Sequence, residues 1–119
     1  MTLYGIPNCD TVKKATAWLT KNKVDFDFFD LKKGQLTKKM VNKWIKANGI
    51  EIVVNKKSTT WKNLPEKIRE NFLAGSDIAE ILIEYPTLIK RPVIESDNNI
   101  YIGFDEATYK TSFTNKSII

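Results

Sequence analysis

Residues 3–15 of the chain read LYGIPNCDTVKKA and place its single cysteine, Cys9, between a short apolar run and a helical pattern. A cysteine that follows a strand and begins a helix has backbone N–H groups and the positive end of the helix dipole beside its sulfur. Both favour the thiolate, the nucleophilic form, and Lys13 and Lys14 add positive charge nearby. The pattern favours a reactive thiol, and the alternative is a small buried apolar side chain, as lone cysteines usually are.

The composition limits the chemistry to that of a thiol. With one cysteine and no histidine, the chain cannot form an internal disulfide, a CxxC redox pair or a Cys-rich zinc site, and it lacks the commonest general base. We therefore expect no metal site and no bound cofactor. The length predicts a single domain over residues 1–119. Neither a signal-peptide pattern nor an apolar run of membrane-spanning length is found, so we expect a cytoplasmic protein that does not contact the membrane.

Positive charge gathers in the middle of the chain. Residues 32–67 hold ten lysines and two glutamates, a net charge of +8, whereas the whole chain carries +5. Arginine occurs only at positions 69 and 91, and exposed aromatic residues are scarce among these lysines, so we do not expect direct DNA binding. A lysine-rich face is most often a solvated surface, and an acidic partner is the other reading.

The first thirty residues predict a βαβ unit. Residues 2–5 form a short strand, and a helix then runs from Asp10 or Thr11 to about Lys21. Residues 24–30 alternate apolar and acidic side chains, which is the period-2 pattern of a strand with one buried face. A helical crossover of this length makes the two strands parallel.

Helices and a hairpin are predicted for the rest of the chain. The predicted elements are a helix over residues 37–48 capped by Thr37 and closed by Asn48 and Gly49, a helix from Pro65 to about Phe72, a helix from Ser76 and Asp77 to just before Tyr85, a hairpin over residues 93–103 and a helix over residues 104–111. Residues 50–54 prefer a strand, but a polar loop over residues 55–60 follows, and the type of this segment stays open. The tail over residues 112–119 has no strong pattern.

This order predicts an α/β, thioredoxin-like fold with a mixed four-stranded sheet and a helical insertion at about residues 37–85. The segments YGIPNCDTVKKA (4–15), NKKSTTW (55–61), PTLIKRPV (86–93) and GF (103–104) carry a closer match. On these segments the chain resembles the ArsC family of arsenate reductase-like proteins, and within it the YffB/Spx-type branch. The resemblance spans nearly the full chain.

The resemblance implies a site built on Cys9. In the family the cysteine attacks an oxyanion or a mixed disulfide, and glutathione, as co-substrate, supplies the second thiol. The family's Arg-Pro motif matches Arg91 and Pro92, where the arginine binds the anion and the proline is typically cis. The expected anion-binding residues are Arg91, Lys13, Lys57 and Asn8.

The function that the resemblance implies is a glutathione-dependent thiol reductase with a single-cysteine nucleophile. Its partners would be glutathione or a small anionic substrate, with glutaredoxin as a further partner. Two alternatives stay open: a non-catalytic Spx-like regulator that binds RNA polymerase, and an arsenate reductase proper. The physiological substrate, the electron donor and the oligomeric state do not follow from the sequence.

The chain also departs from the arsenate reductase pattern. The family's histidine before the cysteine loop is Gly5 here, and Val12 stands where arsenate reductases have a serine and Spx-type proteins have a second cysteine. Two further anion-binding arginines of the family fall near Asn55 and at about Gly103. The nearest lysines offer point charges instead of a planar fork, so we expect arsenate to be reduced poorly.

Overall fold

The computed structural model of the chain describes residues 1–113. Backbone contacts divide the chain into two compact units: unit 1 holds residues 1–30 and the chain from Arg91 onward, and unit 2 holds residues 31–90. The predicted helical insertion at residues 37–85 falls within unit 2. Of the predicted tail, residues 114–119 lie outside the described residues.

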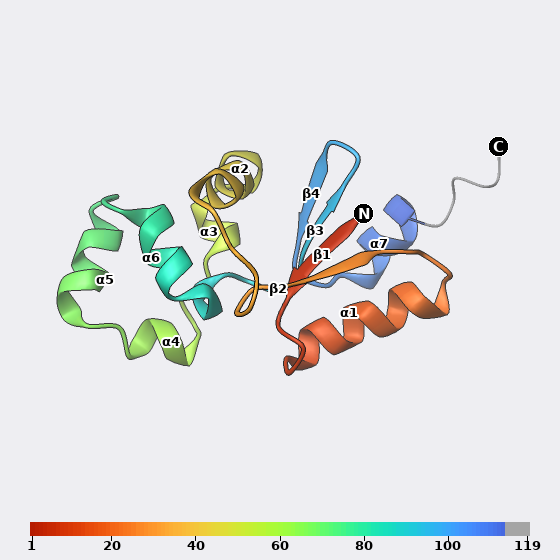
Figure 1. Cartoon of the computed structure of the whole chain (residues 1–119), viewed down its shortest axis with the longest axis horizontal. Coiled ribbons are helices and arrows are strands. Elements are labelled where there is room, and N and C mark those ends of the chain that lie inside the picture. The colour runs from red at the N-terminus through yellow and green to blue at the C-terminus, as the bar shows by residue number, and fades with distance from the viewer. Residues whose placement is uncertain (114–119) are drawn as a thin grey trace. The chain divides into compact units, whose positions relative to one another are not determined.

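Unit 1 contains a mixed four-stranded sheet in the order β2-β1-β3-β4 (Figure 1). Strand β1 (Thr2–Gly5) runs parallel to β2 (Asp27–Asp30) and antiparallel to β3 (Val93–Ser96), which pairs with β4 (Asn99–Ile102). The predicted α/β fold with a mixed four-stranded sheet is thus confirmed.

Strand β2 is shorter than the predicted strand over residues 24–30. The backbone N–H of Val24 donates to the carbonyl of Leu19, at 2.9 Å, and therefore belongs to the turn after the preceding helix. Pairing with β1 begins only at Asp27. The alternating pattern identified the strand, but backbone hydrogen bonds set where it starts.

Two helices of unit 1, α1 (Asp10–Lys21) and α7 (Glu106–Phe113), pack on the same face of the sheet. Leu3 and Ile94 are paired neighbours on adjacent strands, so their side chains share that face. The core formed there consists of Leu3, Val12, Ala15, Leu19, Ile94, Tyr109 and Phe113. Helix α7 extends past the predicted end at residue 111 because Phe113 is buried and packs on Tyr109, with ring centroids 5.3 Å apart.

Unit 2 is built from short helices (Figure 1). They are α2 (Lys38–Asn48), α3 (Ile50–Val53), α4 (Thr59–Lys62), α5 (Glu66–Leu73), α6 (Ile78–Glu84) and the 3₁₀ helix η1 (Pro86–Leu88). Helix α2 has the predicted ends: the Thr37 hydroxyl accepts a hydrogen bond from the N–H of Met40 at 3.2 Å, and Gly49 follows with φ 86°. Trp44 of α2 and Leu82 of α6 are fully buried where these two helices pack together.

The ambiguous segment over residues 50–54 is a helix followed by one bridging residue. The carbonyl of Gly49 accepts hydrogen bonds from the N–H groups of Ile52 and Val53, both at 3.2 Å, which closes a helical turn in spite of the strand preference. Val54 then forms an isolated bridge with Ile89. Of this segment, only Val54 pairs as a strand residue would.

Two local predictions in unit 2 were wrong. The predicted loop over residues 55–60 ends early, because Ser58 caps α4 by accepting a hydrogen bond from the N–H of Trp61 at 3.1 Å. Asp77 precedes α6 in the left-handed conformation, with φ 56°, and makes no capping hydrogen bond through its side chain. Within residues 1–113, no helix has the length and apolar character needed to cross a membrane.

Candidate active site

The thiol of Cys9 lies at the start of α1. Cys9 is the N-cap residue, in an extended conformation with φ −120° and ψ 126°, and its carbonyl accepts the N–H of Lys13 at 2.9 Å. As a thiol its side chain makes no capping hydrogen bond. The side chain is half-buried and not in a disulfide, so solvent still reaches it.

The surroundings of Cys9 stabilise its ionised form. Burial raises the pKa of the thiol. Three neighbours lower it and together outweigh burial: the backbone N–H of Val12, the hydrogen bond and positive charge of Arg91, and the backbone N–H of Thr11. The pKa of Cys9 therefore lies below its ordinary value. Oriented N–H groups at a helix start and a guanidinium are two recognised ways to favour a thiolate.

Pro92, the residue after Arg91, is linked by hydrogen bonds to the core of unit 1. The Arg91–Pro92 peptide bond is cis, which is the geometry that the resemblance implied. The carbonyl of Pro92 accepts the N–H of Gly103, and the carbonyl of Gly103 accepts the hydroxyl of buried Tyr109, both at 2.8 Å. Burial, together with the negative charge of Asp105, raises the pKa of Tyr109, which keeps its hydroxyl a donor.

The sequence of the chain matches the model of the ArsC family over residues 4–112. The chain belongs to the ArsC family. An uncharacterized protein of Haemophilus influenzae is 41% identical over 113 residues, which cover 95% of this chain and 98% of that protein. The global transcriptional regulator Spx of Streptococcus pyogenes is 30% identical over 108 residues, 89% of this chain and 79% of Spx.

The solved structure of the YFFB protein has the same fold. It superposes with a TM-score of 0.87 at 32% identity and covers 95% of this chain and 98% of that one. The fold class and the resemblance to the YffB/Spx-type branch of the ArsC family are thus both confirmed.

Gly5 and Val12, two positions at which this ArsC-family chain departs from the arsenate reductase pattern, are in contact with each other. A Cβ atom at Gly5 would lie 2.9 Å from Cγ2 of Val12, closer than packed carbon atoms approach. Val12 is 1% exposed and fills the space beside Gly5. A histidine at position 5 would therefore need a smaller or displaced side chain at position 12.

The structure brings together part of the site that the sequence predicts. Cys9 and Arg91 interact directly within unit 1. Asn8 is exposed in the turn just before Cys9, and Lys13 is exposed on α1. Among the described residues, the cation that lowers the pKa of Cys9 is Arg91 and not Lys13.

Lys57 belongs to unit 2, in the loop before α4. Its backbone N–H donates to Oδ1 of Asn55 at 3.0 Å, and its side chain is exposed. With Lys56 and Lys90 it lines a cavity of about 310 Å³. The sequence analysis missed Lys90, because only the bridge between Val54 and Ile89 brings its segment to this loop.

Proposed function

We propose that this ArsC-family protein is a glutathione-dependent thiol reductase in which Cys9 is the nucleophile. The observation that supports the proposal is the Cys9 sulfur at the start of α1, where two backbone N–H groups and Arg91 lower its pKa. A thiol with a lowered pKa is ionised at neutral pH to a larger extent and attacks disulfides faster than an ordinary one. The proposal places the protein in the cytoplasm, where glutathione keeps thiols reduced.

The reaction takes two thiol–disulfide exchanges. The Cys9 thiolate attacks the glutathionyl sulfur of a mixed disulfide, the S–S bond breaks, and the substrate leaves as a thiolate that takes up a proton. A glutathione thiolate then attacks the glutathionyl sulfur on Cys9, which releases oxidised glutathione and restores the Cys9 thiolate. The substrate sulfur is reduced to a thiol and one glutathione thiol is oxidised, while the first glutathionyl sulfur stays at the disulfide level throughout, so no bound cofactor is needed.

An external thiol is required because Cys9 is the only cysteine in the chain. Glutathione supplies it in this proposal, and glutaredoxin is the alternative donor. Arg91 binds a carboxylate of glutathione through its planar fork, and Lys13 and Asn8 of the same unit contribute further contacts to the anion.

Intact-mass spectrometry after treatment with oxidised glutathione tests the proposal. The native protein is expected to gain one glutathionyl group, which reduced glutathione removes, and the Cys9→Ser variant is expected to gain none. In a coupled assay, the native protein should reduce a mixed disulfide of glutathione and a small thiol. An adduct that forms only after denaturation would identify Cys9 as a core residue and overturn the proposal.

A regulator that binds RNA polymerase is the second candidate function, because Spx is a relative over most of this chain. Val12 stands at the position of the second cysteine of the Spx-type switch and is buried, so this site forms no internal disulfide. Binding of the purified protein to RNA polymerase, unchanged in Cys9→Ser and without disulfide turnover, would favour this candidate over the reductase.

Arsenate reduction is the least favoured candidate, and we predict little turnover of arsenate. Gly103 is buried with φ 85°, a conformation that an arginine would adopt only under strain. Loss of hydrogen bonds from two arginines costs on the order of 3 to 6 kcal/mol, or about a hundredfold to ten-thousandfold in rate. Robust arsenate turnover by the unmodified protein, lost in Cys9→Ser, would show that lysines suffice.

A further inference from the structure

The carbonyl group of Gly103 lies where the pairing of β3 with β4 ends. In the register of the two strands Val93 is opposite Ile102, which places Pro92 opposite Gly103. The N–H of Gly103 donates to the carbonyl of Pro92 at 2.8 Å. In an antiparallel pair of this kind the second residue returns a hydrogen bond through its own N–H, but proline has no N–H to donate. The strand pairing therefore supplies no donor from position 92 to the carbonyl of buried Gly103.

The hydroxyl of Tyr109 takes the place of that missing donor. It donates to the Gly103 carbonyl at 2.8 Å, and Tyr109 is 1% exposed. A buried carbonyl without a hydrogen bond is costly, so this bond holds the loop at the end of the hairpin. Burial and the negative charge of Asp105 raise the pKa of Tyr109, so the hydroxyl keeps its proton over the pH range in which a thiol ionises.

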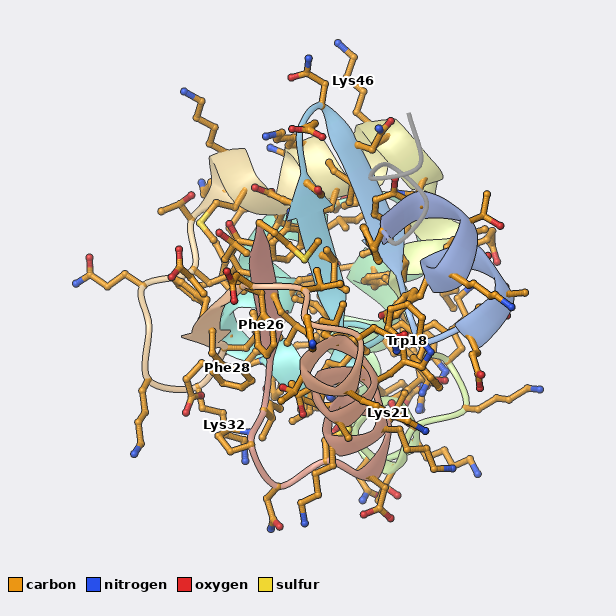
Figure 2. All side chains as sticks on the ribbon, turned by 90° about the vertical axis from the view of Figure 1, so that its right-hand side faces the viewer. Trp18, Lys21, Phe26, Phe28, Lys32 and Lys46 are labelled. Carbon is orange, nitrogen blue, oxygen red and sulfur yellow. The ribbon has the colours of Figure 1, made fainter. Side chains whose placement is uncertain are left out.

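The ring of Tyr109 is held by aromatic contacts that do not involve its hydroxyl. Its centroid lies 5.0, 5.3 and 5.6 Å from the ring centroids of Phe104, Phe113 and Trp18. Figure 2 shows Trp18 on the side of α1 that faces α7, the helix that carries Tyr109. Packing thus fixes the direction of the hydroxyl, and a phenylalanine at this position would keep the same packing.

We propose that Tyr109 is a positioning residue, whose hydroxyl holds Arg91 in place beside the Cys9 sulfur. Two hydrogen bonds of 2.8 Å lead from this hydroxyl to Pro92, the residue bonded to Arg91. Arg91 in turn hydrogen-bonds to Cys9. Hydrogen bonds weaken steeply with poor distance and angle, so a displacement at Pro92 reaches the thiolate. The inference rests on the proposed function, since it concerns the thiolate that attacks the mixed disulfide.

A purely structural role for the hydroxyl is the alternative. Gly103 lies between β4 and α7, so the bond from Tyr109 also ties α7 to the loop that precedes it. Such a role would affect the melting temperature but not the ionisation of Cys9. Measuring the ionisation of the thiol and the stability of the fold separately distinguishes the two roles.

Alkylation of Cys9 by iodoacetamide as a function of pH, in the full-length Tyr109→Phe variant, tests the proposal. Phenylalanine keeps the ring and removes only the hydroxyl. We expect the rate below the alkylation midpoint to fall about threefold and the limiting rate at high pH to stay constant, because the thiol holds its proton more tightly. The melting temperature should fall as well, since the buried Gly103 carbonyl loses its donor.

A double-mutant cycle with Arg91→Gln shows whether the hydroxyl acts through the guanidinium. In the Arg91→Gln background, Tyr109→Phe should leave the alkylation midpoint unchanged, although the melting temperature still falls. The matched control is Tyr101→Phe, which also removes a tyrosine hydroxyl from a ring that contacts Phe113 but lies outside the link to Pro92. This control should keep the native alkylation profile.

Three outcomes would overturn the proposal. An unchanged alkylation profile in Tyr109→Phe would leave the hydroxyl a purely structural role. An equal loss of rate in the Arg91→Gln background would show that the effect does not pass through Arg91. An equal loss of rate in Tyr101→Phe would show that any loosening of this core raises the alkylation midpoint.

NMR spectroscopy of the unmodified protein covers the case in which Tyr109→Phe does not fold. The Gly103 amide signal should shift as Cys9 titrates, and it should stay constant in Arg91→Gln. A signal that does not follow Cys9 in the unmodified protein would also contradict the proposal. Alkylation needs no glutathione, so the two proposals fail separately. Missing glutathione turnover with the expected alkylation profiles overturns the reductase alone, and turnover with an unchanged profile in Tyr109→Phe overturns the positioning role alone.

Discussion

Helices α1 and α2 begin in the same way but direct their first-turn N–H groups to different acceptors. Both follow an extended residue: Cys9, with φ −120° and ψ 126°, and Thr37, with φ −111° and ψ 159°. The Thr37 hydroxyl caps its own helix by accepting the N–H of Met40. The Cys9 thiol caps nothing, and the N–H groups that follow it favour its ionised form. A helix start can therefore stabilise the fold or a reactive anion, depending on the side-chain atom at its N-cap.

Among substitutions at the two helix starts, Cys9→Ser should have the largest effect. The serine should abolish disulfide turnover and glutathionylation, because the nucleophilic sulfur is gone. Its oxygen is a good N-cap, so at a pH below the folded pKa of Cys9, where the native sulfur is a thiol, the free energy of unfolding should stay constant or rise by up to about 1 kcal/mol. Turnover assays and urea denaturation measure the two quantities. A marked loss of stability would show that the sulfur mainly serves packing.

Arg91→Lys should produce the next largest effect. A lysine keeps the charge but loses the planar fork, which should raise the pKa of Cys9 and weaken contacts to the glutathione carboxylate. Hydrogen bonds to charged groups contribute roughly 1.5 to 3 kcal/mol, so we expect turnover to fall about tenfold to hundredfold. Steady-state turnover and the pH dependence of Cys9 alkylation measure this.

Lys13→Ala is the matched control for Arg91→Lys. Lys13 is an exposed cation on α1, where solvent screens its charge, and its loss should change turnover by no more than about threefold. If both variants lose the same activity, diffuse positive charge rather than the fork of Arg91 supports the thiolate.

The pH dependence of the native protein tests whether the start of α1 stabilises the Cys9 thiolate. Because the pKa of Cys9 is lowered, its alkylation rate should reach half of its maximum below the value of about 8.5 found for free cysteine. The folded state binds the proton less tightly than the unfolded state. The resulting gain in stability is therefore complete above the unfolded pKa and is lost as the pH falls through the folded pKa.

The difference in melting temperature between the native protein and Cys9→Ser measures this linkage. The native protein should gain on the variant as the pH rises from the folded pKa to about 8.5, and the difference should then stay constant. A difference that does not change with pH, together with an ordinary alkylation midpoint, would argue against a stabilised thiolate.

The sequence predicted the features that depend on local chemistry. A capping threonine, a closing glycine and an apolar stripe at helical spacing identified α2 with both of its ends. The position of Cys9 before α1 likewise predicted that backbone N–H groups lie beside its sulfur. The resemblance to the ArsC family supplied Arg91, which nothing in its local sequence marks as part of a site.

The features that the sequence did not predict depend on contacts between distant segments. Residues 50–54 have strand preference, yet hydrogen bonds to the Gly49 carbonyl make most of them helical. Lys90 reaches the loop of Lys57 only through a bridge between residues far apart in the chain. The close approach of Gly5 to Val12 requires the packing of a strand against a helix. Residue propensities and the spacing of residues along the sequence contain no information on these contacts.

The smallest expected effect is the loss of a capping bond in Thr37→Ala. Alanine removes the oxygen that accepts the Met40 N–H, and losing such a cap costs about 1 kcal/mol, within a range of roughly 0.5 to 2 kcal/mol. Thr37→Ser, which keeps the oxygen, should lose much less. At a pH below the folded pKa of Cys9, where the sulfur is a thiol and makes no capping hydrogen bond, Cys9→Ala should cost less than the change at α2, and the cost is limited to the packing of a half-buried sulfur. Urea denaturation of the three variants, with hydrogen exchange at Met40, provides the comparison. Equal losses in Thr37→Ala and Cys9→Ala would mean that the two helix starts contribute alike to stability, and the distinction between them would then rest on the charge of Arg91 alone.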